Sequence, residues 1–249
     1  MDNLQVSDFK PDWSIHPGEV LEEYVEALGL SQAEFARRAD LTAKLVNTII
    51  KGKNPVEAST AVNLERVTGM KAYIWTRLQD DWDLSVSRAS ERAKHDETNV
   101  ETWLAKFPLK ELIGRGVLPK TEDVFTQRNA LLSFFGVANE RAYSNWDERL
   151  SVCYRASPTF RSSKECVRVW LQLAKHAADQ MEIAPFNGDR LLDAVKEMRA
   201  LTNENAEIFQ PRLTKLCAAA GVAVVPVPPL KGTKLNGAAF WFGSFMVFK

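Results

Sequence analysis

The sequence predicts a mainly α-helical fold with an N-terminal domain of five helices, a helical middle, and a small, incomplete α/β part at the C-terminal end. Three observations predict it. Apolar residues recur at spacings of three and four through most of the 249 residues, which is the period of an α-helix. Serine, threonine and glycine residues divide the first part into short segments. Only after Gly221 do runs of β-branched and aromatic residues appear that are typical of strands.

The first two helices are marked by residues that start and stop helices. Pro17 stands at the first position of a helix that Gly29 ends. Ser31 followed by Glu34 is a capping box, which starts a second helix that ends near Asp40. Helical spacing assigns these residues to the buried faces: Val20, Leu21, Tyr24 and Leu28 in the first helix, and Phe35, Ala36 and Ala39 in the second.

Three more helices follow in this domain. Thr42 is the expected N-cap of the third helix, which Gly52 ends. A fourth helix is expected from about 58 to 68, with Gly69 as its stop, and a fifth begins after it. Their expected buried residues are Leu45, Val46, Ile49 and Ile50, then Ala61, Leu64 and Val67, then Trp75, Leu78, Trp82 and Leu84.

The division into domains follows from a loss of pattern. The fifth helix fades into a charged stretch through His95 and Asn99, which is typical of a boundary. We expect residues 14–84 to form the five-helix domain, residues 85–120 a helical linker, and residues 121–249 a helical region that ends in the α/β segment.

The rest of the chain is expected to stay helical until near its end. Helical spacing continues from about 100 to 205, where Ser162 with Glu165 forms another capping box. The period then changes, and we expect a helix at 206–221, a strand at 222–227, and one or two strands at 237–249.

Composition restricts the classes of function. Thirty-two basic and 32 acidic residues cancel, so attraction to nucleic acid or to a membrane must come from local patches. Cys153, Cys166 and Cys217 form no CxxC pair and are odd in number, which favours a reducing compartment. The N-terminus has no signal-peptide pattern, and no apolar run is long enough to span a bilayer. We therefore expect a cytoplasmic protein with no membrane partner.

The second and third helices are expected to form a helix-turn-helix. Only Asp40 and Leu41 separate them, and so short a link forces two helices to cross steeply. Ala36 is expected where the two helices approach most closely, because a small residue is needed there. The third helix then presents a polar face on the side opposite Val46 and Ile49.

This polar face has the composition of a surface that reads DNA. It contains no carboxylate, and its small, amide, hydroxyl and amine groups are those that recognise base edges in a major groove. Residues 31–55 carry five basic and two acidic residues, a net charge of +3. The alternative is that these are ordinary solvated helix faces. We expect Ala43, Lys44, Asn47 and Thr48 to face base edges, and Ser31, Gln32, Arg37, Arg38, Thr42, Lys51 and Lys53 to contact phosphates.

The segment from His16 to Leu84 resembles the HigA-type antitoxins of the XRE-like (Cro/C1-type) helix-turn-helix class. The opening "HPGE" and the ending "W..LQ..WDL" are its most specific parts. The chain departs from the family at Asp40, where the family usually has glycine, but aspartate tolerates a left-handed backbone better than most residues.

The resemblance implies a homodimer that binds a palindromic operator in double-stranded DNA, often its own promoter, and a small toxin protein as a further partner. Pairing about a two-fold axis is physically reasonable, because it sets two recognition helices about 34 Å apart on one side of the duplex. Trp75 and Trp82 could lie in the dimer contact, although core packing is the favoured alternative.

The region from 121 to 241 resembles the segment that leads into an ImmA/IrrE-type zinc metallopeptidase domain in longer proteins with the same helix-turn-helix. That family uses an HExxH helix, in which two histidines one turn apart share a zinc ion. His16, His95 and His176 are far apart in the sequence and none is followed by glutamate. The last residues, "FGSFMVFK", also differ from the family. We expect no metal site and no cofactor.

The sequence holds no other pattern typical of an enzyme, such as a P-loop, a GxGxxG after a strand or a GxSxG. We therefore expect a DNA-binding transcriptional regulator with no catalytic residues, and a HigA-like antitoxin that represses its own operon as a dimer. Two alternatives stay open. One is a regulator of the same family that senses a ligand or a protein and has no toxin partner, and the other, less favoured, is a zinc metallopeptidase fragment.

Overall fold

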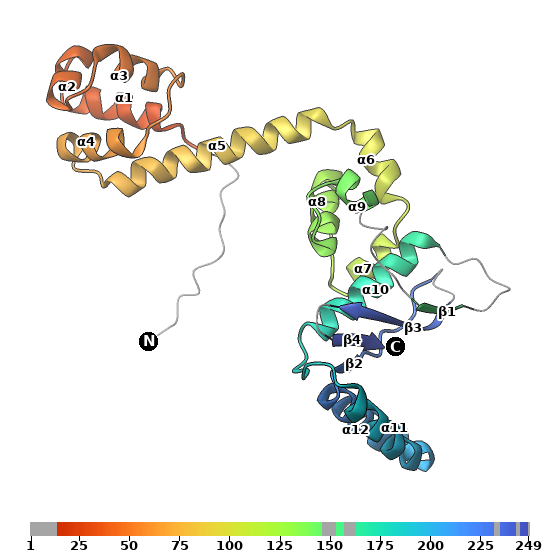
Figure 1. The fold of residues 1–249 in the computed structure, drawn as a ribbon. Coiled ribbons are helices and arrows are strands. Elements are labelled where there is room, and N and C mark those ends of the chain that lie inside the picture. The colour runs from red at the N-terminus through yellow and green to blue at the C-terminus, as the bar shows by residue number, and fades with distance from the viewer. Residues whose placement is uncertain (1–13, 146–152, 157–162, 232–234, 243–244, 249) are drawn as a thin grey trace, which may run out of the picture. The chain divides into compact units, whose positions relative to one another are not determined.

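The computed structural model describes residues 14–145, 153–156, 163–231, 235–242 and 245–248 (Figure 1). The chain divides into two compact units, 1–95 and 96–249, each with its own hydrophobic core. Helices dominate both units, so the prediction of a mainly α-helical fold is confirmed.

The N-terminal unit contains the five predicted helices. They are α1 (Pro17–Ala27), α2 (Gln32–Arg38), α3 (Ala43–Ile50), α4 (Ala58–Thr68) and α5 (Ala72–Lys94). Their buried core consists of Leu21, Val25, Phe35, Ala36, Ala39, Val46, Ile49, Val56, Ala61, Leu64 and Trp75. The helices α1 to α4 have at most 11 residues and are too short to be stable alone, so this shared core is what stabilises them.

Two residues expected in the core are exposed. Leu28 is 45% exposed because α1 ends at Ala27, and Val25 fills the core position in its place. Leu84 is 51% exposed because it lies half a helical turn from the face of α5 that carries Trp75 and Trp82. The first error extends α1 one residue too far, and the second includes a residue that does not follow the helical period.

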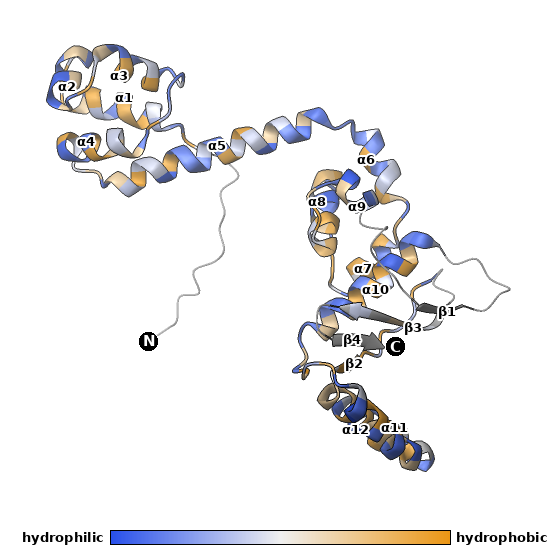
Figure 2. Ribbon diagram, in the orientation of Figure 1, coloured by the Kyte–Doolittle hydropathy of each residue, from blue (hydrophilic) through white to orange (hydrophobic). Residues whose placement is uncertain are grey.

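The segment expected to be a linker, 85–120, belongs to both units in the structure. Its first ten residues continue α5, where polar side chains predominate (Figure 2). Its later residues contribute to the second core through Val100, Leu104, Phe107, Leu112 and Leu118. The observed division between His95 and Asp96 lies in the charged stretch expected to hold the boundary, whereas the end expected for the five-helix domain, residue 84, is too early.

Glu65, near the C-terminal end of α4, holds the start of α5. Its Oε2 accepts the backbone N–H of Ala72 (2.7 Å), and its Oε1 accepts from Nζ of Lys71 (3.1 Å). The Ala72 N–H first, and Lys71 second, keep the pKa of Glu65 below its ordinary value. A carboxylate whose pKa is lowered on folding stabilises the fold above its ordinary pKa, and this stabilisation is lost as the pH falls through the folded value.

We therefore expect Glu65→Ala to lower the melting temperature at pH 7, and the difference from wild type to shrink at pH 3. Thermal unfolding followed by circular dichroism measures both values. Glu57→Ala is the control, because Glu57 precedes α4 without a side-chain capping bond and should change the melting temperature little at either pH. An equal loss for Glu65→Ala at both pH values would contradict the role of its charge.

The second unit combines helices with one small sheet. Its helices are α6 (Glu97–Leu104), α7 (Leu109–Gly114), α8 (Val124–Phe135), α9 (Glu140–Asn145), α10 (Lys164–Ala178), α11 (Gly188–Ala200), the 3-10 helix η2 (Leu201–Asn203) and α12 (Ala206–Ala219). The strands β1 (Cys153–Ala156), β2 (Val222–Val224), β3 (Leu235–Phe242) and β4 (Phe245–Phe248) lie in the order β1-β3-β4-β2. β3 is antiparallel to both neighbours, whereas β2 is parallel to β4.

Several details of this unit differ from expectation. The four-residue β1 lies in a region expected to be helical, and it is a strand because it pairs with the distant β3. The N-cap of α10 is Ser163, whose Oγ accepts the N–H of Cys166, so the predicted capping box at Ser162 was one residue early. Ser162 itself lies outside the described residues.

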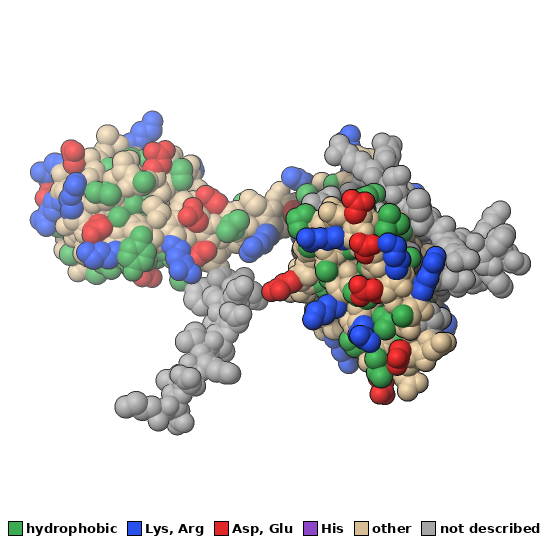
Figure 3. Space-filling view, turned by 60° about the horizontal axis from the view of Figure 1, so that its bottom comes forward, with side chains coloured by type: hydrophobic (Ala, Val, Ile, Leu, Met, Phe, Trp, Pro, Cys, Tyr) green, Lys and Arg blue, Asp and Glu red, His purple; other side chains and the backbone are tan. Residues whose placement is uncertain are grey.

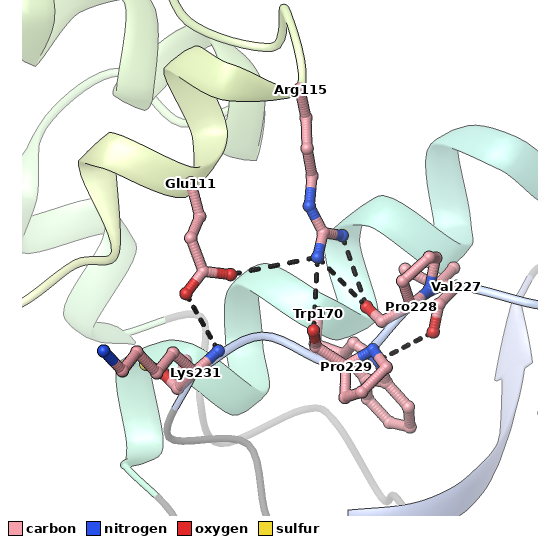
Figure 4. Close-up of polar contacts among 8 residues, drawn as sticks. Glu111, Arg115, Trp170, Val227, Pro228, Pro229 and Lys231 are labelled. Atoms are coloured by element: carbon pink, nitrogen blue, oxygen red, sulfur yellow. Dashed lines mark hydrogen bonds and ion pairs between the residues drawn. The ribbon is translucent and has the colours of Figure 1, made fainter.

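The expected strand at 222–227 ends early, at Val224. Prolines at 226, 228 and 229 have no N–H to donate to a neighbouring strand. Side chains, and not a strand, form the hydrogen bonds that hold this segment (Figure 4). Arg115 donates to the carbonyls of Pro228 and Pro229 (3.3 and 3.2 Å). The carboxylate of Glu111 accepts the N–H of Lys231 (2.9 Å). These bonds connect α7 to the segment that leads into β3.

Candidate nucleic-acid interface

The turn between α2 and α3 is built from local signals. The hydroxyl of Ser31 accepts the N–H of Glu34 (3.2 Å), and the hydroxyl of Thr42 accepts the N–H of Leu45 (3.1 Å). These two caps start α2 and α3 at the predicted residues. Between them Asp40 has a φ of 53°, so the predicted left-handed backbone at this residue is confirmed.

Small residues let the two helices cross closely. The N–H of Leu41 donates to the carbonyl of Ala36 (2.8 Å), which closes the turn, and both Ala36 and Ala39 are buried. On α3, Val46 and Ile49 are buried against them. The helix-turn-helix predicted for this stretch is confirmed.

The opposite face of α3 is open to solvent. Ala43 and Lys44 are exposed, and Asn47 and Thr48 are half-buried. The four side chains lie on one face because they are spaced by one, three and four residues. We name this surface, with Lys51 at its end, the α3 stripe. The contact of Ala43, Lys44, Asn47 and Thr48 with base edges stays a prediction.

Asn47 is held by a residue of the neighbouring helix. Its Nδ2 donates to Oε1 of Gln32, the first residue of α2, over 3.1 Å. A primary amide has two N–H groups and one carbonyl, so this bond leaves Asn47 one donor and its acceptor. A bidentate contact with adenine uses one donor and one acceptor. The sequence pattern predicted a phosphate contact for Gln32 but did not indicate this pairing, which joins residues in two different helices.

The hydroxyl of Thr48 already has internal partners. Its Oγ1 lies 3.0 Å from the carbonyl oxygens of both Lys44 and Leu45. Since the hydroxyl proton is used within the helix, Thr48 offers an external group only its lone pairs and its methyl group. It can therefore accept a hydrogen bond from a base or pack against a thymine methyl group.

The turn that ends α3 fixes the backbone that carries two lysines. The N–H of Gly52 donates to the carbonyl of Ile49 (2.9 Å), and the N–H of Lys53 donates to the carbonyl of Thr48 (2.8 Å). This pair of bonds is a Schellman motif, and it requires the left-handed φ of 65° that Gly52 adopts. Lys51 and Lys53 flank Gly52 and are both exposed.

Arg37 and Arg38 are both exposed at the end of α2. Both lie on the side of α2 away from its buried residues Phe35 and Ala36. Both also pair with Glu34, with 3.2 Å between Nε of Arg38 and a carboxylate oxygen. Figure 3 shows several Lys and Arg side chains at the end of the N-terminal unit nearest α2. The contact of Arg37 and Arg38 with phosphates stays a prediction.

The three histidines lie in separate elements. His16 caps α1, His95 follows α5, and His176 is inside α10. Within the described residues, no three His, Cys, Asp or Glu side chains are grouped so that they could hold a metal ion.

Burial raises the pKa of the Cys217 thiol. No helix in the described part of the chain is both long and apolar enough to cross a membrane.

Comparison with known proteins identifies this unit. Residues 21–74 match the family model for the helix-turn-helix. Over 81 residues the chain is 32% identical to virulence-associated protein I of Dichelobacter nodosus. The aligned region covers 32% of this chain and 75% of that protein. Over 69 residues it is 29% identical to the uncharacterized HTH-type transcriptional regulator YddM of Escherichia coli K12. That alignment covers 28% of this chain and 73% of the regulator.

A solved structure of similar sequence is the Pseudomonas aeruginosa antitoxin HigA with the higBA promoter. The two chains are 30% identical in sequence, and their alignment covers 33% of this chain and 90% of the antitoxin chain, with a TM-score of 0.31. Together with the match to the family model and the Dichelobacter relative, the geometry of α2 and α3 establishes that this chain belongs to the helix-turn-helix family of DNA-binding transcriptional regulators.

Proposed function

We propose that the protein is a HigA-like antitoxin that represses its own operon by binding a palindromic operator as a dimer. The observation that carries the proposal is the Asn47–Gln32 pair in the centre of a stripe without carboxylates. An amide held by a second amide has a fixed orientation, and a fixed orientation is what base-specific contact requires.

In this proposal the residues divide into two groups by the information that they read. Lys44, Asn47 and Thr48, with Ala43 beside them, face base edges in the major groove. The phosphate contacts come from Gln32, Lys51 and Lys53, with the hydroxyls of Ser31 and Thr42 at the starts of α2 and α3. Arg37 and Arg38 add positive potential near the duplex, because Glu34 already pairs with both.

The dimer follows from the size of one reading surface. The exposed face of an eight-residue helix contacts only a few base pairs, so a long operator needs two copies. Two copies related by a two-fold axis read a palindrome with half-sites about 34 Å apart. A small toxin protein is the further partner that this role requires, and no cofactor, metal ion or catalytic residue takes part in it.

We expect Asn47→Ala and Lys53→Ala to weaken DNA binding in different ways. Asn47→Ala removes a base contact, so it should cost about 1–3 kcal/mol on the specific site and little on random DNA. Lys53→Ala removes a phosphate contact, so it should weaken binding to all DNA equally and reduce the salt dependence by about one contact. Fluorescence anisotropy, with the protein's own upstream DNA and scrambled DNA of equal length, measures both effects at two salt concentrations.

Two results would contradict the assignment. Equal losses on specific and scrambled DNA for both variants would remove the distinction between base and phosphate contacts. A wild-type protein that binds both duplexes equally would remove autorepression, because specific complexes of this kind exceed non-specific ones by about a thousandfold or more. Lys120→Ala is the matched control, since Lys120 is an exposed lysine of the second unit and its loss should change neither value.

A second candidate function is a regulator that senses a ligand or a protein and has no toxin partner. It is favoured by the second unit, because residues 96–249 form a core of their own and lie outside the 21–74 match. A small open reading frame of toxin size beside the gene would support the antitoxin, and its absence would support the sensor. Metal analysis tests a zinc peptidase fragment, and stoichiometric zinc in the purified protein would contradict our proposal that the protein is not an enzyme.

A further inference from the structure

His16 lies at the junction between the start of α1 and the end of α3. Its side chain is buried, with 6% of its surface exposed. The Nδ1 atom accepts the N–H of Gly18 over 2.9 Å, so the ring caps α1 and its orientation is fixed. The other edge of the ring is thereby directed away from α1.

That other edge covers the Schellman turn of α3. A Cβ atom placed on Gly52 would lie 3.6 Å from Nε2 of His16 and 3.7 Å from Cε1, which is van der Waals contact. Gly18 approaches the same turn, because a Cβ atom on Gly18 would lie only 2.2 Å from the carbonyl oxygen of Ile49. The start of α1 therefore packs directly on the last turn of α3.

The helix α5 contacts both the His16 ring and the chain that follows α3. Trp82 meets His16 edge to face, with 5.0 Å between ring centroids and an interplanar angle of 87°. One turn earlier, Oε1 of Gln79 accepts the N–H of Val56 over 2.9 Å. The turn with Lys51 and Lys53 is thus fixed at one end by α3, at the other by Gln79, and beneath Gly52 by His16.

We propose that His16 is a positioning residue for the phosphate contacts of Lys51 and Lys53. The inference rests on the proposed function, since it concerns the same DNA surface. The backbone of residues 51–53 determines which phosphates the two flexible lysine side chains can reach. Without the ring under Gly52, that backbone can move away from α1 while α3 and its base-reading residues stay in place.

The substitution that separates this role from simple capping is His16→Asn. Asparagine is a preferred N-cap, so its side-chain oxygen can accept an N–H at the start of α1 while the ring is removed. The measured quantity is the slope of log K against log[salt] for the full chain on a random-sequence duplex, which changes by about 0.9 for each phosphate contact. Random DNA is sufficient because phosphate contacts do not depend on sequence.

We expect His16→Asn to reduce this slope by about 0.9 to 1.8, which corresponds to one or two contacts. The double variant Lys51→Ala/Lys53→Ala should reduce it by about 1.8. Adding His16→Asn to that double variant should change the slope no further, because His16 acts through these two lysines. Binding to the upstream DNA should keep its preference over random DNA, because Asn47 is untouched.

A purely structural role for His16 gives a different result. Val25→Ala is the control, because it removes buried methyl groups of α1 away from its N-terminal end and lowers stability without touching the turn. This control should weaken binding without changing the slope. If His16→Asn also weakens binding with the wild-type slope, the proposal is overturned. A double lysine variant with the wild-type slope would also overturn it, together with the phosphate contacts assigned to Lys51 and Lys53, whereas a retained preference for the upstream DNA would leave the operator-binding role in place. Failure of the wild-type protein to bind DNA would overturn the proposed function as well.

Discussion

Gly18→Ala is expected to lower the free energy of unfolding of the N-terminal unit by about 2–3 kcal/mol, as overpacking of a close contact does. The new Cβ atom would lie 2.2 Å from the carbonyl oxygen of Ile49 and 2.7 Å from Nδ1 of His16. The first neighbour is backbone, so it cannot rotate away. The start of α1 must then separate from the end of α3.

Helix propensity alone predicts the opposite sign. Gly18 is inside α1 and has no positive φ, and replacing a helical glycine with alanine ordinarily stabilises a helix by about 0.5–1 kcal/mol. The clash outweighs this gain because the carbonyl of Ile49 is fixed by the Schellman turn. The same displacement breaks the cap made by His16, so DNA affinity should fall together with stability.

Thermal and urea unfolding of the full chain measure this effect, with Gly114→Ala as a matched control. Gly114 is also helical, at the end of α7, but a Cβ atom there meets no atom within 4 Å. That substitution should therefore be neutral or stabilising by up to about 1 kcal/mol. Equal effects of the two alanines would show that the contact with Ile49 does not constrain α1.

The parts of the fold that local signals determine were predictable from the sequence. Ser31 and Thr42 cap helices by binding N–H groups three residues away, and Gly52 ends a helix through its own backbone conformation. Such contacts involve neighbours in the sequence, so composition and spacing are enough to indicate them. The helix-turn-helix followed directly from these ends.

Contacts between distant residues were not predictable in the same way. The strand β1 depends on pairing with β3 more than seventy residues later, and nothing in four residues indicates that partner. The Asn47–Gln32 bond depends on the crossing angle of two helices.

The second unit contains an ion pair with one buried partner, which sequence patterns also did not indicate. Arg128 in α8 is 1% exposed, and its Nε and Nη2 atoms bind the two carboxylate oxygens of Glu140 at the start of α9 (2.5 and 2.9 Å). Its Nη1 also donates to the side chain of Asn129 (3.0 Å). Such a pair contributes little net stability compared with apolar residues, but each partner depends on the other.

Glu140→Ala is expected to destabilise the second unit by about 3–5 kcal/mol, because it leaves the guanidinium of Arg128 buried without its carboxylate. Arg128→Met combined with Glu140→Ala should recover part of this loss, since methionine fills similar space without a charge. Glu197→Ala, on the exposed side of α11, is the control and should change stability by less than about 0.5 kcal/mol.

Calorimetry of the full chain can follow the two units separately, since each has its own core. We expect Glu140→Ala to lower the melting transition of residues 96–249 while the transition of residues 1–95 stays in place, and DNA binding below both transitions should keep the wild-type affinity. Loss of affinity in this variant would mean that the second unit contributes to the DNA-binding state, which would favour the sensing regulator over the antitoxin. A double variant no more stable than Glu140→Ala would instead contradict the assignment of the cost to a buried charge that has lost the carboxylate of Glu140.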